Sequence, residues 1–313
     1  MGFIAHWEEV SGRSRSVGHI DAVWSDLGGA VGTRDVGLSR IEVAPGRWST
    51  PAHVEAGEEE IFFVLAGSGL SWQDGSVYEV GAGDCLVHLP GREAHTLRAG
   101  NEGLDVLAFG QRVWHGNTHL PRAGVSWMTP AYVDATTISF PQGRHPFHRE
   151  AEAGEPEVGA PEARPASIVS VDAADAIRWG KGERVRATRR NLGRAAGSER
   201  TGLQHAVVEP GHYGQVPHCH SSEEEIFVVL DGEGTLELGD DEHAVRRGSV
   251  VGRPPGTGVA HAFRAGASGL TYLAYGTRDG RDLCYYPRSG KVSFRGIGLI
   301  GRFEQVEYWE GET

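Results

Sequence analysis

Two histidines one residue apart, His218 and His220, stand at the start of a cluster of residue types that bind metal ions. In a β-strand alternate side chains share a face, so both imidazoles point to the same side. Carboxylates follow in the run SSEEE at 221–225, and a third histidine, His261, lies just beyond a turn-forming PPGTG segment. Imidazoles at i and i+2, a carboxylate on the next strand and an imidazole from a distant strand form a set that suits a mononuclear site for Fe, Mn, Ni, Cu or Zn.

The same cluster occurs a second time, with one alteration. The segment PHCHSSEEEIFVVLDG at 217–232 is matched by AHVEAGEEEIFFVLAG at 52–67, in which Glu55 replaces the second histidine. A shift of 165 residues aligns these segments, and after one inserted residue a shift of 166 pairs HTLRAG at 95–100 with HAFRAG at 261–266. Matches at so constant an offset indicate a duplicated domain.

The elements that position these residues are predicted to be short strands. Apolar runs such as IFFVL, IFVVL, VLAF and YLAY are separated by glycine-bearing turns, which predicts an all-β fold of two sandwich- or barrel-type units over 1–140 and 167–313. Residues 141–166 are rich in Pro, Glu, Ala and Gly and are predicted to be an exposed linker. A solvated turn is expected at four glutamates that precede the apolar strands: Glu58, Glu59, Glu223 and Glu224.

The spacing of the motif residues resembles that of the cupin superfamily. The pattern G-x6-HxH-x4-E-x6-G is read from Gly211 to Gly232, and G-x5-P-x-G-x4-H from Gly248 to His261. The resemblance implies a bicupin, that is, two tandem antiparallel β-barrels of the double-stranded β-helix or jelly-roll type. It selects Glu225 among the three glutamates and implies two ligand sets, His218, His220, Glu225 and His261 in the second copy and His53, Glu55, Glu60 and His95 in the first.

The first copy departs from the family pattern at Glu55. Two buried carboxylates close together, Glu55 and Glu60, repel each other unless a cation or a proton lies between them. Either the first site holds a harder, oxygen-preferring divalent ion, or it is empty and one glutamate is protonated or turned away. We therefore expect catalysis in the second copy and an auxiliary or structural role for the first.

The resemblance implies several chemistries, because cupins include dioxygenases, decarboxylases, isomerases, storage proteins and ligand sensors. We expect a metal-dependent enzyme that acts on a small oxygenated molecule, first of all a dioxygenase-like oxidoreductase, with one divalent metal per intact site. Fe or Mn is favoured over Ni or Zn, and Glu225 serves as fourth ligand or as general base. The alternatives are a metal-dependent decarboxylase or isomerase and, from another class, a non-catalytic ligand-binding bicupin.

The composition of the chain limits the classes of binding partner that we expect. The chain of 313 residues has a net charge of −12 and no lysine- or arginine-rich run, which argues against nucleic acid and anionic membranes as partners. Three separated cysteines without CxxC spacing indicate free thiols, and the N-terminus lacks an apolar signal segment. These features predict a cytoplasmic protein with a small-molecule substrate that can also form a homo-oligomer.

Overall fold

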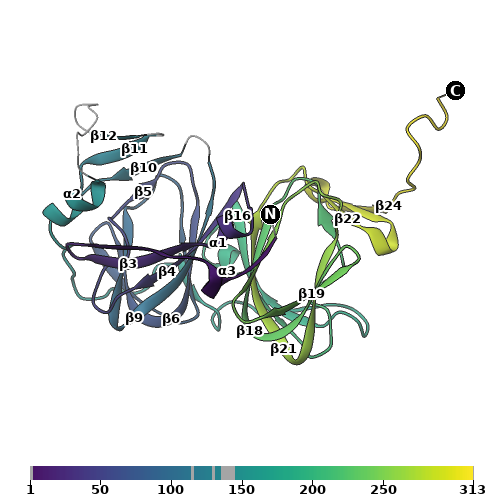
Figure 1. Cartoon of the computed structure of the whole chain (residues 1–313), viewed down its shortest axis with the longest axis horizontal. Coiled ribbons are helices and arrows are strands. Elements are labelled where there is room, and N and C mark those ends of the chain that lie inside the picture. Colours follow the sequence, from purple (N-terminus) through teal and green to yellow (C-terminus); the bar gives the residue numbers. More distant parts are fainter. Residues whose placement is uncertain (1–2, 114–115, 129–130, 135–144, 313) are drawn as a thin grey trace.

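The computed structural model describes residues 3–113, 116–128, 131–134 and 145–312. It consists of two β-rich lobes that lie side by side, one N-terminal and one C-terminal (Figure 1). The large antiparallel sheet of the N-terminal lobe has the strand order β13 (Ile168–Ser170), β8 (Asp84–His88), β6 (Glu60–Gln73), β9 (His95–Gln111), β4 (Val36–Val43), β3 (Ile20–Asp26) and β2 (Arg13–Val17). Strand β7 (Ser76–Gly81) pairs with β6. Its small sheet has the order β12 (Ala131–Asp134), β11 (Val125–Met128), β10 (Asn117–Leu120) and β5 (Val54–Glu55).

The C-terminal lobe repeats this arrangement. Its large sheet has the order β1 (Ile4–His6), β20 (Ser249–Arg253), β18 (Glu225–Leu238), β21 (His261–Thr277), β16 (Thr201–Val208), β15 (Ala187–Arg190) and β14 (Ile177–Trp179), with β19 (Asp241–Arg246) paired to β18. Its small sheet has the order β17 (Cys219–His220), β22 (Leu283–Tyr286), β23 (Lys291–Phe294) and β24 (Leu299–Arg302). The predicted all-β fold of two tandem antiparallel barrels is confirmed.

Helical segments in the described residues are short. The α-helices are α1 (Leu27–Ala30), α2 (Pro146–Glu152) and α3 (Leu192–Ala195), and the 3-10 turns are η1 (Trp7–Glu9), η2 (Pro287–Ser289) and η3 (Arg295–Ile297). Within the described part of the chain, no helix is both long and apolar enough to cross a membrane.

The two lobes exchange short strands, so the predicted domain limits of 1–140 and 167–313 are wrong at their starts. β1, at the N-terminus, pairs with β20 of the C-terminal lobe, and β13 pairs with β8 of the N-terminal lobe. Each exchanged strand has only three residues, which is too short to carry a hydrophobic period in the sequence.

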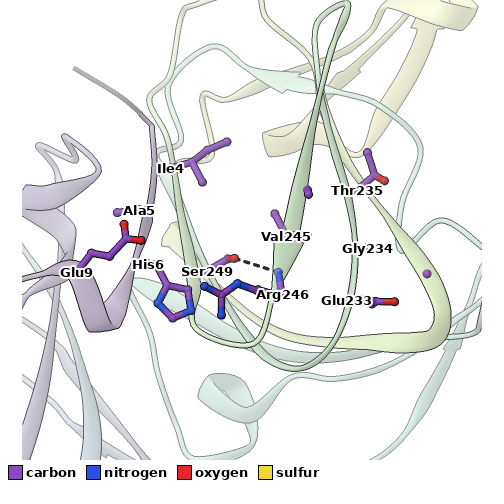
Figure 2. Close-up of a pocket in the computed structure, with 12 residues that line it drawn as sticks. Ile4, Ala5, His6, Glu9, Glu233, Gly234, Thr235, Val245, Arg246 and Ser249 are labelled. Carbon is purple, nitrogen blue, oxygen red and sulfur yellow. Dashed lines mark hydrogen bonds between the residues drawn. The ribbon is translucent and has the colours of Figure 1, made fainter.

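Figure 2 shows where β1 lies against the C-terminal lobe, with His6 beside the turn that joins β19 to β20. The imidazole Nε2 of His6 lies 3.0 Å from the Arg247 carbonyl oxygen, and the Trp7 N–H donates to the Gly248 carbonyl at 2.9 Å. An open cavity of about 560 Å³ lies between β1 and the β18–β19 hairpin. Its lining includes none of the His, Cys and carboxylate groups that converge elsewhere in the described residues, so we assign it no chemistry.

The lobes also share a hydrophobic core. Each lobe has its own apolar cluster inside its barrel. A further cluster joins residues from both halves, and within it the rings of Phe109 and Tyr275 lie 5.0 Å apart. Burial of apolar surface is the main stabilising term in folding, so this shared cluster stabilises the contact between the two lobes.

Two glutamates of the predicted solvated turns instead anchor each lobe to the other. Glu59 is fully buried, and its carboxylate accepts hydrogen bonds from backbone and hydroxyl groups of residues 198–201. Glu224 is 1% exposed and accepts from the backbone N–H groups of residues 34–36 at 2.6–3.0 Å. The contacts are related by the duplication, and the expectation of a solvated turn is wrong at both positions.

The predicted linker at 141–166 is wrong in part, because a segment of it packs on the N-terminal lobe. α2 lies at 146–152, and the ring of Phe147 meets Trp24 edge-on at 5.9 Å. Glu150 is fully buried and forms an ion pair with Arg122 at 2.7 Å. Most residues from 157 to 167 are exposed, as predicted, whereas 141–144 lie outside the described residues.

The glycines that close the first motif of each copy permit a close approach of two strands. Gly67 and Gly232 have φ values of +80° and +76°, and an added Cβ would lie 2.2 Å from the carbonyl oxygen of Gly103 or Gly269, respectively. No larger side chain fits there, which gives a physical reason for glycine in the middle of the ligand-bearing strands β6 and β18.

Candidate functional site

The four ligands predicted for the second copy come from separate segments that meet inside the C-terminal lobe. His218 and His261 form an antiparallel backbone bridge, with N–H to carbonyl distances of 3.2 and 2.9 Å. His220 lies in β17, and Glu225 is the first residue of β18. His261 opens β21, the strand next to β18, but in this pairing Glu225 lies opposite Gly276 and His261 lies opposite Leu238. The ladder has register shifts between 229 and 234, and such irregularities bend strands. The two side chains therefore meet across the interior of the barrel and not through neighbouring positions of the ladder.

The Glu225 carboxylate is the centre of this cluster. Its Oε2 lies 3.1 Å from Nε2 of His261 and 3.5 Å from Nε2 of His220. Ligand atoms of His218, Glu225 and His261 all lie within 4.8 Å of one another. The structure therefore brings the predicted residues of the second copy together around a common point.

The ring nitrogens of two of these histidines are oriented by hydrogen bonds on their far side. Nδ1 of His218 lies 3.0 Å from the Val216 carbonyl oxygen, which can only accept, so Nδ1 carries the proton and Nε2 keeps a lone pair. Nδ1 of His220 lies 2.7 Å from Oδ2 of Asp282. Such partners fix the orientation of an imidazole and present Nε2 to a metal ion.

Asp282 is a functional residue that sequence reasoning missed. It is fully buried, and its other oxygen accepts from the backbone N–H groups of Ser221 and Ser222, both at 3.0 Å. It lies far from the motif in the sequence, in a segment without a repeat match, so no spacing rule selects it. Cys284 was missed as well: it is buried opposite His220 in the small sheet, and it has a ligand atom within 4.8 Å of those of His218 and His220.

The protonation states favour a bound cation. Burial, aided by the nearby His261, lowers the pKa of His218 to about 3, so this imidazole is neutral at pH 7. Burial alone would raise the pKa of the Glu225 carboxyl, but the neighbouring imidazoles outweigh it and hold that pKa well below its usual range. A neutral imidazole and an ionised carboxylate are the forms that coordinate a divalent ion.

The site passes a further test of fit to a metal ion. Nε2 of His220, Oε2 of Glu225 and Nε2 of His261 are buried and have no hydrogen-bond partner among the described residues. Buried polar atoms without partners are costly, and atoms that point to a common centre are satisfied together by one cation. Three imidazoles with one carboxylate suit a first-row divalent ion such as Mn or Fe.

A cavity of about 320 Å³ opens next to this cluster. His218, Glu225 and His261 belong to its lining. The rest of its wall includes three arginines, a second carboxylate, an amide and aromatic rings, namely Arg189, Arg278, Arg295, Glu223, Gln215, Phe227, Phe263, Tyr272 and Tyr286. A pocket with an apolar wall and a few convergent polar groups is the usual form of a small-molecule site.

The first copy brings together three of its four predicted ligands, His53, Glu60 and His95. Oε2 of Glu60 lies 3.0 Å from Nε2 of His95 and 3.6 Å from Nε2 of His53. Burial disfavours the charged imidazole, but the contact with Glu60 outweighs burial and raises the pKa of His53 to about 9. At neutral pH His53 and Glu60 thus form an ion pair.

Glu55 is not part of that group. Its Oε1 accepts a hydrogen bond from the Thr118 hydroxyl at 2.7 Å, across the pairing of β5 with β10. Burial and the nearby Glu60 raise the pKa of Glu55 to about 7. The prediction that Glu55 occupies the place of His220 is therefore wrong in detail, because the side chain turns to a neighbouring strand.

The cavity of the N-terminal lobe also differs from its counterpart. It has a volume of about 850 Å³ and reaches Glu60, but the described residues that line it include neither His53 nor His95. The imidazoles of the first copy thus do not line this cavity, although the His53 side chain is 13% exposed.

Comparisons with known proteins agree with this architecture. The family model "Cupin domain" matches residues 39–117 and 204–271. No curated protein sequence matches the chain. Among solved structures, oxalate decarboxylase from Bacillus subtilis at pH 4.6 is 14% identical, with a TM-score of 0.58 over 88% of this chain and 76% of that chain.

Two further structures are similar to the same extent. The formate complex of oxalate decarboxylase from Lactobacillus farciminis is 14% identical, with a TM-score of 0.58 over 88% of this chain and 86% of that chain. A Bacillus subtilis oxalate decarboxylase structure described by its Mn(II) centres is 13% identical, with a TM-score of 0.57 over 89% and 78% of the two chains. At this identity the likeness shows a shared fold.

Proposed function

We propose that this chain, which matches the cupin domain model over 39–117 and 204–271, is a metal-dependent decarboxylase of a small oxygenated carboxylic acid. The observation that carries the proposal is the convergence of the unpartnered atoms Nε2 of His220, Oε2 of Glu225 and Nε2 of His261 beside a cavity. Similar structures are oxalate decarboxylases, one of them described by its Mn(II) centres, so decarboxylation with Mn(II) replaces the dioxygenase chemistry expected from the sequence.

In this proposal His218, His220, Glu225 and His261 hold the ion in the C-terminal lobe. A bound divalent cation acts as a Lewis acid and stabilises negative charge that develops on substrate oxygen. Asp282 keeps the His220 ring in place through the hydrogen bond at Nδ1, and His218 is fixed in the same way by the Val216 carbonyl.

Loss of carbon dioxide leaves an electron pair on carbon, which must then take up a proton. Two residues that line the cavity, Tyr272 and Tyr286, carry hydroxyl groups. Burial raises the pKa of both hydroxyls, so both keep their protons at neutral pH and can deliver one to the carbon. The ring of Tyr286 lies nearly parallel to that of His218 at 6.0 Å, which places it beside the metal ligands.

The test is an assay of purified protein loaded anaerobically with Mn(II), Fe(II) or Zn(II). Small hydroxy, oxo and dicarboxylic acids, oxalate among them, are supplied, and carbon dioxide release and oxygen uptake are measured together. We expect carbon dioxide without stoichiometric oxygen uptake, lost in His261→Ala and kept in His243→Ala, a histidine of β19 outside the cavity lining.

Three results would overturn the proposal. Oxygen consumed in proportion to product would restore a dioxygenase, and formation of an isomer without carbon dioxide would show an isomerase. A protein that binds acids tightly but turns none of them over would be the non-catalytic bicupin.

A further inference from the structure

Arg189 brings a positive charge without an acidic partner into the cavity of the C-terminal lobe. Its Nη2 donates to the Gly214 carbonyl at 2.9 Å and to Oε1 of Gln215, and its Nε is buried without a partner. No carboxylate forms an ion pair with it within the described residues. The guanidinium carbon lies 4.4 Å from the centre of the Trp179 ring, which fixes the plane of the group at the cavity wall.

One side-chain amide connects this arginine to a metal ligand. Because a guanidinium only donates, the oxygen of Gln215 faces Arg189 and the amide nitrogen faces the other way. That nitrogen lies 2.9 Å from Nε2 of His218, the atom that keeps a lone pair. The planar amide of Gln215 thus spans Arg189 and the ligand cluster, and its oxygen accepts from the guanidinium.

Aromatic side chains form the wall beside this polar edge. The rings of Phe263 and Tyr272 lie 4.9 Å apart, and Phe227 lies 5.1 Å from Phe263. The cavity volume of about 320 Å³ equals roughly ten water molecules at about 30 Å³ each, far more than an acid of two carbons fills.

The duplication supplies an internal comparison. The shifts that align the two copies place Trp24, Thr50 and Val106 where the second copy has Arg189, Gln215 and Tyr272. Phe263 likewise aligns with a leucine of the first copy, at position 97. The guanidinium of Arg189, the amide and most of the aromatic wall therefore have no counterpart in the first copy, and they are not requirements of the fold.

Formal charges also favour an anion in the second cavity. Three neutral imidazoles, Glu225 and a divalent ion leave one net positive charge. The cavity lining adds three arginines, Arg189, Arg278 and Arg295, and one further carboxylate, Glu223. The lining as a whole therefore attracts an anion.

We propose that the acid bound in the C-terminal cavity is an aromatic carboxylate, whose carboxylate is held by Arg189 and whose ring packs against Phe227, Phe263 and Tyr272. This inference rests on the proposed function for the use of the cavity, and it adds the substrate class and the subsite. The guanidinium attracts the carboxylate through its positive charge, and the aromatic wall excludes water from the ring.

The test is calorimetric titration of Mn(II)-loaded and metal-free protein with benzoate, acetate and the neutral isostere benzamide. We expect benzoate to bind at least about tenfold more tightly than either of the others. In Arg189→Gln the benzoate affinity should fall about ten- to hundredfold, in Arg189→Lys it should fall less, and manganese content should not change. The matched control is Arg186→Gln, which removes an arginine charge three residues away, outside the cavity lining.

Equal binding of benzoate and benzamide, or equal loss in Arg186→Gln and Arg189→Gln, would overturn the inference. If Arg189→Gln fails to fold, the Arg189→Lys variant gives the test. The inference would be overturned if that variant bound benzoate as tightly as the unchanged protein and bound acetate as tightly as benzoate. Benzoate binding that depends on Arg189, without carbon dioxide release from any acid, would leave the subsite standing and refute the decarboxylase. Carbon dioxide release without benzoate binding that depends on Arg189 would support the decarboxylase and refute the subsite.

Discussion

Replacing Glu59 with glutamine is predicted to weaken the junction of the two lobes strongly. Glu59 is fully buried, and the donors that converge on it are the N–H groups of Glu199, Arg200 and Thr201 and the hydroxyls of Ser198 and Thr201. Glutamine keeps the shape but has a single acceptor oxygen, and its amide group turns two hydrogens toward these donors.

The expected loss of stability follows from the number of hydrogen-bond donors that lose their acceptor. Oε2 accepts two N–H groups, from Glu199 at 2.7 Å and Arg200 at 3.1 Å, and at least those two lose their acceptor if the amide nitrogen takes that place. Each buried donor without an acceptor costs about 1–3 kcal/mol, so we expect the free energy of unfolding to fall by about 3–5 kcal/mol.

The difference should depend on pH. Burial alone would raise the pKa of Glu59, but the hydrogen bonds from Thr201 and the backbone outweigh it and lower that pKa in the folded protein. A carboxyl with a lowered folded pKa stabilises the protein fully above its unfolded pKa, about 4.3, and this contribution is lost as pH falls through the folded value.

Guanidinium unfolding at pH 7 and below pH 4, followed by tryptophan fluorescence, measures both effects. Glu102→Gln, at an exposed position, is the control and should change stability by less than about 0.5 kcal/mol. A loss below about 1 kcal/mol for Glu59→Gln at pH 7, or a loss that does not shrink in acid, would refute the reasoning.

Other predictions concern the same junction and the two sites. Glu224→Gln, which removes the matching acceptor of three N–H groups, should destabilise the protein by a similar amount in the same assay; a neutral effect would show that the junction is not symmetric in energy. Asp282→Asn should weaken Mn(II) binding about 10–100-fold by calorimetry, because the Nδ1 partner of His220 is lost, and unchanged affinity would remove Asp282 from the site. In His261→Ala, where the first site alone is intact, Mn(II) affinity should rise up to about tenfold per pH unit from pH 6 to 9, since His53 with its pKa of about 9 must release a proton; a flat profile would contradict this.

Much of the fold could be predicted from the sequence because the duplication repeats its signals. The constant offset between the copies and the short apolar runs indicate two β-barrels, and motif spacing selects Glu225 among three adjacent glutamates. These signals are local, and the strand period converts them directly into geometry.

The contacts between distant segments could not be predicted in that way. Glu59 and Glu224 look like solvated residues in a polar run, and only the packing of the lobes shows that they cap backbone turns of the opposite lobe. Asp282 and Arg189 reach the site from strands or loops outside the motifs, where one charged residue in a sequence carries no sign of its direction. The exchanged strands β1 and β13 are too short to show a period.

The most direct test of the central claim is anomalous scattering at the manganese edge from crystals of Mn(II)-loaded protein. We predict a peak at coordination distance from Nε2 of His218, His220 and His261 and from the Glu225 carboxylate. A peak at His53 and His95 alone, or none at the four residues of the second copy, would contradict the placement of the metal centre in the C-terminal lobe.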